Sequence, residues 1–154
     1  MSKSETKSSV YFWEDFSAKN LRESSVGRKG LSLFKLKDMD IPVPEFFVIS
    51  SSVFKDIAFK SLNRDIDKLT KKGRNPENDE IEKSILKTDF KEEILDQIQT
   101  AYTRISGFTD AWVSVRSSVV FPASPEVSFS GIFATELNVR HMRQLTDAIK
   151  HIYS

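Results

Sequence analysis

The sequence predicts an α+β domain in which a small mixed sheet is packed by helices. Two kinds of apolar pattern support this class: spacings of three or four residues, typical of amphipathic helices, and short alternating or continuous runs, typical of strands. Apolar residues make up 39% of the 154 positions and include twelve phenylalanines, which is enough for one hydrophobic core. We therefore expect a single globular domain.

The expected limits of that domain follow from the two ends of the sequence. Residues 1–9 are small and polar, so we expect a disordered tail, followed by a domain over residues 10–154. The aromatic cluster from Val10 to Trp13 is interpreted as core or domain-edge packing. The apolar spacing continues to Ile152 without a helix cap, so we expect this sequence to be part of a longer chain.

The first half of the domain reads as helix, strand, helix. A short helix is predicted near 31–37, and the prolines Pro42 and Pro44 then impose an extended connection into a strand near 46–49. One of three serines at 50–52 can cap the next helix, predicted over 52–62. The charged stretch 63–89 is interpreted as a solvated excursion with short helical candidates around Ile66 and Ile85.

The second half begins with the helix that has the clearest pattern. It is predicted over 89–106, with Thr88 as its cap and Gly107 as its end. Strands are predicted near 112–116 and 132–139, joined by a loop that contains two prolines. A last helix is predicted over 141–153.

Charge and composition exclude several classes of function. The 23 Lys and Arg residues almost balance the 22 Asp and Glu residues, so bulk charge gives no reason to expect nucleic acid or an anionic membrane as a partner. The absence of cysteine excludes disulfides and thiolate metal sites. With no signal peptide and no apolar run near about 20 residues, the sequence predicts a cytoplasmic protein with no membrane partner.

Two cationic side chains stand out as candidate phosphate ligands. Lys29 lies between Gly27 and Gly30 at the predicted entrance of a helix, where the helix dipole and unpaired backbone N–H groups favour an anion. Arg116 ends a predicted strand, and its guanidinium can donate two parallel hydrogen bonds to phosphate oxygens. Each signal alone is weak. Lys29 could be a surface lysine, and Arg116 could pair with Glu126.

The other candidates have simpler interpretations. Ser117 and Ser118 are read as turn-forming hydroxyls, because neither His141 nor His151 has the context of a serine base. No carboxylate set reads as a metal site, and no residue is assigned as catalytic. Three further arginines are expected to face solvent: Arg22, Arg28 and Arg140.

Four motifs in one order, taken together, resemble a known family. They are Val26-Gly27-Arg28-Lys29-Gly30, then Ile41-Pro42-Val43-Pro44 with Phe46-Phe47-Val48-Ile49, then Val113 to Ser118, and finally Ser128-Phe129-Ser130-Gly131 with Thr135-Glu136-Leu137-Asn138-Val139. The order and spacing are similar to those in the N-terminal nucleotide-binding domain shared by phosphoenolpyruvate synthase, pyruvate phosphate dikinase and rifampin phosphotransferase. The resemblance covers residues 11–154.

This resemblance implies the first part of an ATP-grasp-type domain that uses ATP and magnesium. In that family ATP phosphorylates a histidine on a separate domain, which passes the phosphate to a small acceptor. The implied partners are therefore ATP, the remaining half of the ATP-binding domain and a phosphohistidine domain, and the piece in hand is expected to be incomplete for catalysis. The implied binding residues are Lys29, Arg116, Gly27, Gly30, Gly131 and Thr135.

The sequence also departs from the family pattern. Arg28 replaces a glycine, the segment 119–122 is apolar where the family is partly polar, Phe47 replaces a glycine, and Glu136 stands where an apolar residue is common. These departures favour an alternative: a non-catalytic module that retains the fold and uses it for protein interaction. A nucleic-acid binder is a third possibility and would require salt-sensitive association.

Overall fold

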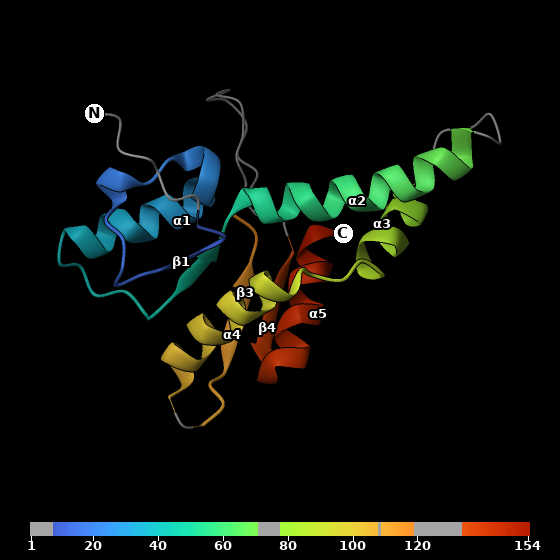
Figure 1. Cartoon of the computed structure of the whole chain (residues 1–154). Helices are drawn as coiled ribbons and strands as arrows, with labels where there is room; N and C mark the ends of the chain where they lie inside the picture. The colour runs from blue at the N-terminus through green and yellow to red at the C-terminus, as the bar shows by residue number, and fades with distance from the viewer. Residues whose placement is uncertain (1–7, 71–77, 108, 119–133) are drawn as a thin grey trace.

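A computed structural model describes residues 8–70, 78–107, 109–118 and 134–154 of the chain (Figure 1). The elements in chain order are β1 (Val10–Phe12), the short 3-10 helix η1 (Ala18–Asn20), α1 (Glu23–Asp38), β2 (Phe47–Ile49), α2 (Ser51–Thr70), α3 (Asn78–Leu86), α4 (Glu92–Ser106), β3 (Val113–Arg116), β4 (Thr135–Val139) and α5 (His141–Tyr153). The predicted α+β class is confirmed.

The strands pair differently from the single mixed sheet that we expected. Within the described residues they form two separate antiparallel pairs, β1 with β2 and β3 with β4. The partner of β2 is the N-terminal aromatic cluster, which the sequence analysis had treated only as packing. Three residues are too few to show a strand period, so this pairing depends on tertiary contacts that the local pattern does not reveal.

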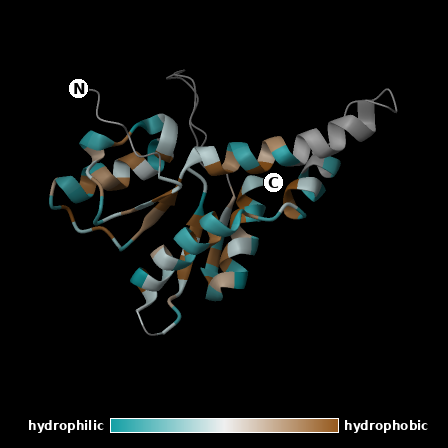
Figure 2. Ribbon diagram, viewed as in Figure 1, coloured by the Kyte–Doolittle hydropathy of each residue, from teal (hydrophilic) through white to brown (hydrophobic). Residues whose placement is uncertain are grey.

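The β1–β2 pair lies between two hydrophobic clusters. Val10 and Phe12 pack into the larger cluster with α2, α4 and α5, whereas Tyr11 between them packs into a second cluster with Val26 and Phe34 of α1. Successive side chains of a strand point to opposite faces, so β1 is apolar at every position because both of its faces are covered. This sheet holds α1 against the rest of the molecule (Figures 1 and 2).

The β3–β4 pair is covered on one face only. Val113 and Val115 are partly buried against the larger cluster, while the alternate residues Ser114 and Arg116 are exposed. Leu145 and Ile149 of α5 contribute buried side chains to the same cluster. The alternation that predicted β3 therefore has its usual cause, a strand with one buried and one solvated face.

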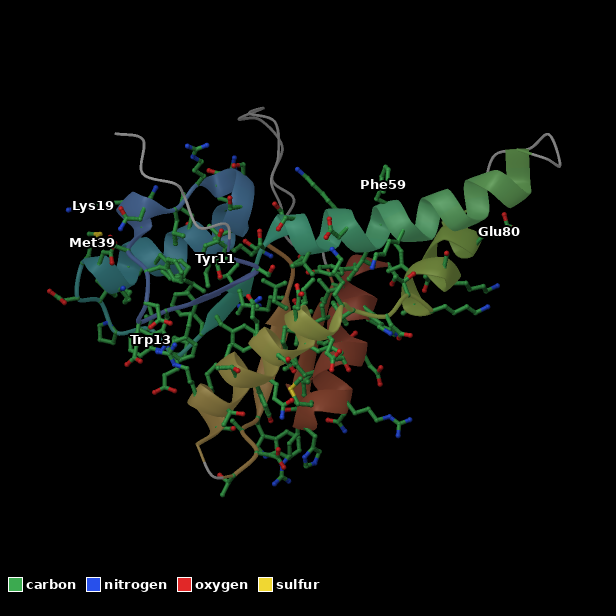
Figure 3. The ribbon with its side chains drawn as sticks, in the orientation of Figure 1. Tyr11, Trp13, Lys19, Met39, Phe59 and Glu80 are labelled. Carbon is green, nitrogen blue, oxygen red and sulfur yellow. The ribbon has the colours of Figure 1, made fainter. Side chains whose placement is uncertain are left out.

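The charged stretch after the predicted second helix is more helical than we expected. Helix α2 continues to Thr70, and α3 packs along its far end (Figure 1). Ser50 caps α2 as predicted for one of the three serines, because its Oγ accepts the N–H of Ser52 at 3.3 Å. Phe59 of α2 is 68% exposed and points away from the rest of the molecule (Figure 3).

The ends of α4 were predicted with mixed success. Gly107 ends the helix with φ 61°, donating its N–H to Thr103, as expected of a glycine C-cap. Thr88 does not cap α4, which begins at Glu92. Its buried hydroxyl instead donates to the carbonyl of Ser84 at 2.8 Å, at the end of α3.

None of the helices within the described ranges has the length and apolar character needed to cross a bilayer.

Candidate functional site

The site begins at a break inside α1. Gly27 has φ 72° and ψ 169°, so the helix is interrupted there and starts again at the next residue. Lys29 is therefore in the first turn of the helical segment 28–38, and its side chain is exposed. The helix entrance that the sequence predicted around Gly27 is present, although a short helical turn precedes it.

A single serine connects this entrance to the end of β3. The Ser118 hydroxyl accepts the backbone N–H of Gly30 at 2.9 Å and donates to the carbonyl of Val26 at 2.8 Å. The contact leaves no room for larger side chains, because a Cβ on Gly27 would lie 2.0 Å from the carbonyl oxygen of Ser118. A Cβ on Gly30 would lie 3.2 Å from Val48 of β2. Both glycines thus permit close approach between segments that are remote in sequence.

Arg116 and Thr135 lie at the same end of the β3–β4 pair. Arg116 is the last residue of β3, two positions before Ser118, and its register partner on β4 is Thr135. Both side chains are exposed. The structure therefore brings the backbone segments that carry Lys29, Arg116 and Thr135 into one neighbourhood. Gly131 and Glu126 lie outside the described residues.

The structure corrects one expectation about this neighbourhood. The sequence predicts that backbone N–H groups at the helix entrance receive an anion, but the Gly30 N–H already donates to Ser118. Positive charge at this end of the site therefore comes from the Lys29 side chain and the helix dipole rather than from the Gly30 N–H. The sequence predicts only a turn-forming hydroxyl at Ser118, not a link between remote segments. The one signal in the sequence was its position directly after Arg116 and Ser117.

The neighbouring arginines do not form part of a cationic cluster. Arg28 is exposed, as predicted, and its Nε lies 3.4 Å from Oε1 of Glu23, a solvent-exposed pair of low expected strength. Arg140 differs from the prediction because it is half-buried and its guanidinium lies 5.3 Å from the Trp112 ring centroid. Arg28 and Arg140 therefore occupy places in the fold that differ from those of Lys29 and Arg116.

The two histidines and Ser117 have other surroundings. His141 Nδ1 lies 2.6 Å from Asp110 and His151 Nδ1 lies 3.6 Å from Glu136, so each histidine faces a carboxylate rather than a serine. The Ser117 hydroxyl oxygen is buried and has no hydrogen-bond partner in the part of the chain that is described. Within those same ranges, no three acidic, histidine or cysteine side chains gather as metal ligands.

Comparison with known proteins identifies the family. Residues 23–154 match the family model described as the pyruvate phosphate dikinase AMP/ATP-binding domain. The chain is 29% identical over 144 residues to phosphoenolpyruvate synthase of Escherichia coli, with 84% of the chain covered. It is 27% identical over 153 residues to the enzyme of Aeropyrum pernix, with 92% covered, and 27% identical over 139 residues to the probable enzyme of Methanothermobacter thermautotrophicus, with 83% covered.

The chain spans only 18% to 20% of the length of these relatives. The matched region includes the interrupted helix α1 and both strands of the β3–β4 pair. It also includes Ser118, the serine that joins α1 to the end of β3. This chain belongs to the pyruvate phosphate dikinase AMP/ATP-binding domain family.

Proposed function

We propose that this chain binds the phosphates of ATP through Lys29 and Arg116, as part of a dikinase-like ATP-binding domain. One observation carries the proposal: Ser118 joins the glycine turn that precedes Lys29 to the strand end that presents Arg116. Two cations that are far apart in sequence thereby come from adjoining backbone segments. Family membership supports the choice of nucleotide, and the adjoining backbone segments support the assignment of these two cations to its phosphates.

The two side chains suit different parts of a polyphosphate. Lysine provides a compact point charge, whereas arginine provides a planar fork that matches two phosphate oxygens. Arg116 is exposed and forms no ion pair within the described ranges, and its guanidinium has the geometry that binds an anion. The buried Ser117 hydroxyl, which lacks a partner among the described residues, is a further polar group at this strand end.

The glycines and Thr135 have supporting roles in this proposal. Gly27 and Gly30 allow the backbone to approach Ser118, and Thr135 places a hydroxyl-bearing residue opposite Arg116 in the sheet. Gly131 is proposed from the resemblance alone. Magnesium would neutralise charge on the phosphate oxygens, and its ligands are not assigned among the described residues.

The activity of the whole protein is a broader proposal. The relatives are about five times longer than the matched region and two are named phosphoenolpyruvate synthase. By analogy, we infer that the remaining part of the ATP-binding domain and a phosphohistidine domain complete the reaction, and that this piece alone does not turn over. An ATP-dependent role is consistent with the cytoplasmic setting predicted from the sequence.

Amide chemical shifts during a titration with MgATP test the proposal. The largest shifts are expected at residues 26–30, 116–118 and 134–136, because these segments adjoin the two cations. Lys29→Ala and Arg116→Ala should each reduce the shifts, whereas Lys35→Ala, which removes an exposed lysine on the same helix, should not. Shifts that are absent at millimolar MgATP, or that map elsewhere, would contradict the proposal.

The second candidate function is protein interaction through a retained fold. Two observations favour it: the Gly30 N–H is already used by Ser118, and Trp112 and Leu137 are 65% and 67% exposed. Both large apolar residues lie on or beside the β3–β4 pair. If the titration gives no nucleotide binding, substitution of these two residues becomes the next experiment.

A further inference from the structure

Ser118 lies where the two halves of the proposed phosphate site meet. Its hydroxyl uses both of its functions on one short segment, accepting from the Gly30 N–H at 2.9 Å and donating to the Val26 carbonyl at 2.8 Å. These two backbone groups flank the break at Gly27, so the hydroxyl bridges the point at which the helix is interrupted. A backbone turn held from both sides has little freedom to change its direction.

The close contact at Gly27 reinforces this bridge. Gly27 is buried, and a hypothetical Cβ would lie 2.4 Å from the Ser118 Oγ and 2.0 Å from its carbonyl oxygen. The backbones of the two segments therefore touch, and the distance between them is fixed by glycine and serine together. Lys29 is one residue from Gly30, and Arg116 is two residues from Ser118, so the backbone that carries each cation is held next to the bridge.

We propose that Ser118 is a positioning residue that fixes the spacing of Lys29 and Arg116 for a polyphosphate. The inference rests on the proposed function, in which these two cations bind the phosphates of ATP. Preorganised donors bind a polyanion more tightly than mobile ones, because little conformational freedom is lost on binding. Ser118 itself acts through its two backbone partners and needs no contact with the nucleotide.

Affinities for MgATP and for adenosine, measured by calorimetry on the full chain, test this inference. Ser118→Ala should weaken MgATP binding about tenfold, which corresponds to about 1.4 kcal/mol, because the segments that carry the two cations lose the hydroxyl that fixes their spacing before the nucleotide binds. Adenosine affinity should remain unchanged, because adenosine has no phosphate. Ser118→Thr retains the hydroxyl and should bind MgATP like the wild type.

A second set of variants separates a positioning role of Ser118 from an effect on general stability. In Lys29→Ala/Arg116→Ala, where both cations are absent, adding Ser118→Ala should leave MgATP affinity unchanged. Melting temperatures of every variant identify those that are unfolded at the temperature of measurement. If Ser118→Ala does not fold, Ser118→Cys replaces it, because a thiol has similar size but is a weak donor and acceptor.

The outcomes separate the two proposals. If the wild type binds MgATP and a folded Ser118→Ala or Ser118→Cys variant binds it equally well, the positioning role is overturned while the proposed function stands. A parallel loss of adenosine and MgATP affinity also overturns it, because that result indicates general disruption. If the wild type binds no MgATP, the proposed function and this inference fail together.

Discussion

The Ser118 hydroxyl oxygen lies 2.9 Å from the backbone nitrogen of Gly30, 88 residues earlier in the chain. This hydrogen bond joins a turn inside α1 to the end of β3, although the two belong to different parts of the fold. Together with the bond from the Ser118 hydroxyl to the Val26 carbonyl, it holds the backbone near positions 29 and 116 in contact. The predictions that follow test contacts that join remote segments of the molecule.

Gly27→Ala should be strongly destabilising. The substitution places a Cβ 2.0 Å from the Ser118 carbonyl oxygen at a residue whose φ is 72°. Gly107→Ala is the matched control, because Gly107 also has positive φ, at 61°, but no atom of the described residues lies within 4 Å of its hypothetical Cβ. Backbone strain alone should cost about 1 to 3 kcal/mol in the free energy of unfolding, and the steric clash should add about 2 kcal/mol or more at Gly27. Equal losses in urea denaturation would show that the close contact is unimportant.

Tyr102→Phe should lower the free energy of unfolding by about 1 to 3 kcal/mol. The buried Tyr102 hydroxyl donates to the carbonyl of Ala111 at 2.8 Å and accepts the N–H of His141 at 3.2 Å. It therefore joins the segment before β3 to the start of α5. Tyr153→Phe is the control, because burial raises the pKa of Tyr153 but its hydroxyl makes no hydrogen bond within the described residues. Equal denaturation midpoints for the two variants would contradict the assigned role.

Asp15→Asn should reduce the dependence of stability on acid pH. The hydrogen bond from Arg104 lowers the pKa of Asp15 below its usual value of 3.8. Since the folded pKa is depressed, the stabilisation is fully present above the unfolded pKa, about 3.9, and is lost as the pH falls through the folded pKa. The difference between wild type and variant should stay under about 1 kcal/mol, because the Asp15 side chain is 49% exposed.

Thermal denaturation from pH 7 to pH 2 measures this effect. The gap in melting temperature between wild type and Asp15→Asn should be largest at neutral pH and should close in the acid range. Asp147→Asn, at an exposed position on α5, is the control and should give no such trend. A gap that widens as the pH falls would show the opposite sign of linkage.

The sequence predicted the elements whose patterns are local. The spacing of Ile94, Ile98 and Tyr102 identified α4, and the alternation of Val113 and Val115 identified β3. Pairing of β1 with β2 was not predicted, because a three-residue strand has no measurable period and the partner of Phe12, Phe47, lies 35 residues further along the chain (47 minus 12). Contacts remote in sequence, not local preference, determine that pair.

The sequence drew attention to residues of the candidate site but did not indicate how the structure joins their segments. Cation type and glycine spacing drew attention to Lys29 and Arg116, because those residue types suit phosphate. The hydroxyl that joins their segments was missed, since a serine that makes a turn and a serine that bridges remote segments look the same in sequence. The availability of the Gly30 N–H was also misjudged, because hydrogen-bond partners come from tertiary structure.

The affinity of the full chain for MgATP, measured by calorimetry in matched variants, tests the central claim most directly. Lys29→Ala and Arg116→Ala should each weaken binding about tenfold or more, because a hydrogen bond from a charged group contributes about 1.5 to 3 kcal/mol. Lys35→Ala and Arg143→Ala, which remove exposed cations from α1 and α5, should bind like the wild type. If all four variants bind MgATP with the wild-type affinity, Lys29 and Arg116 do not form a phosphate site.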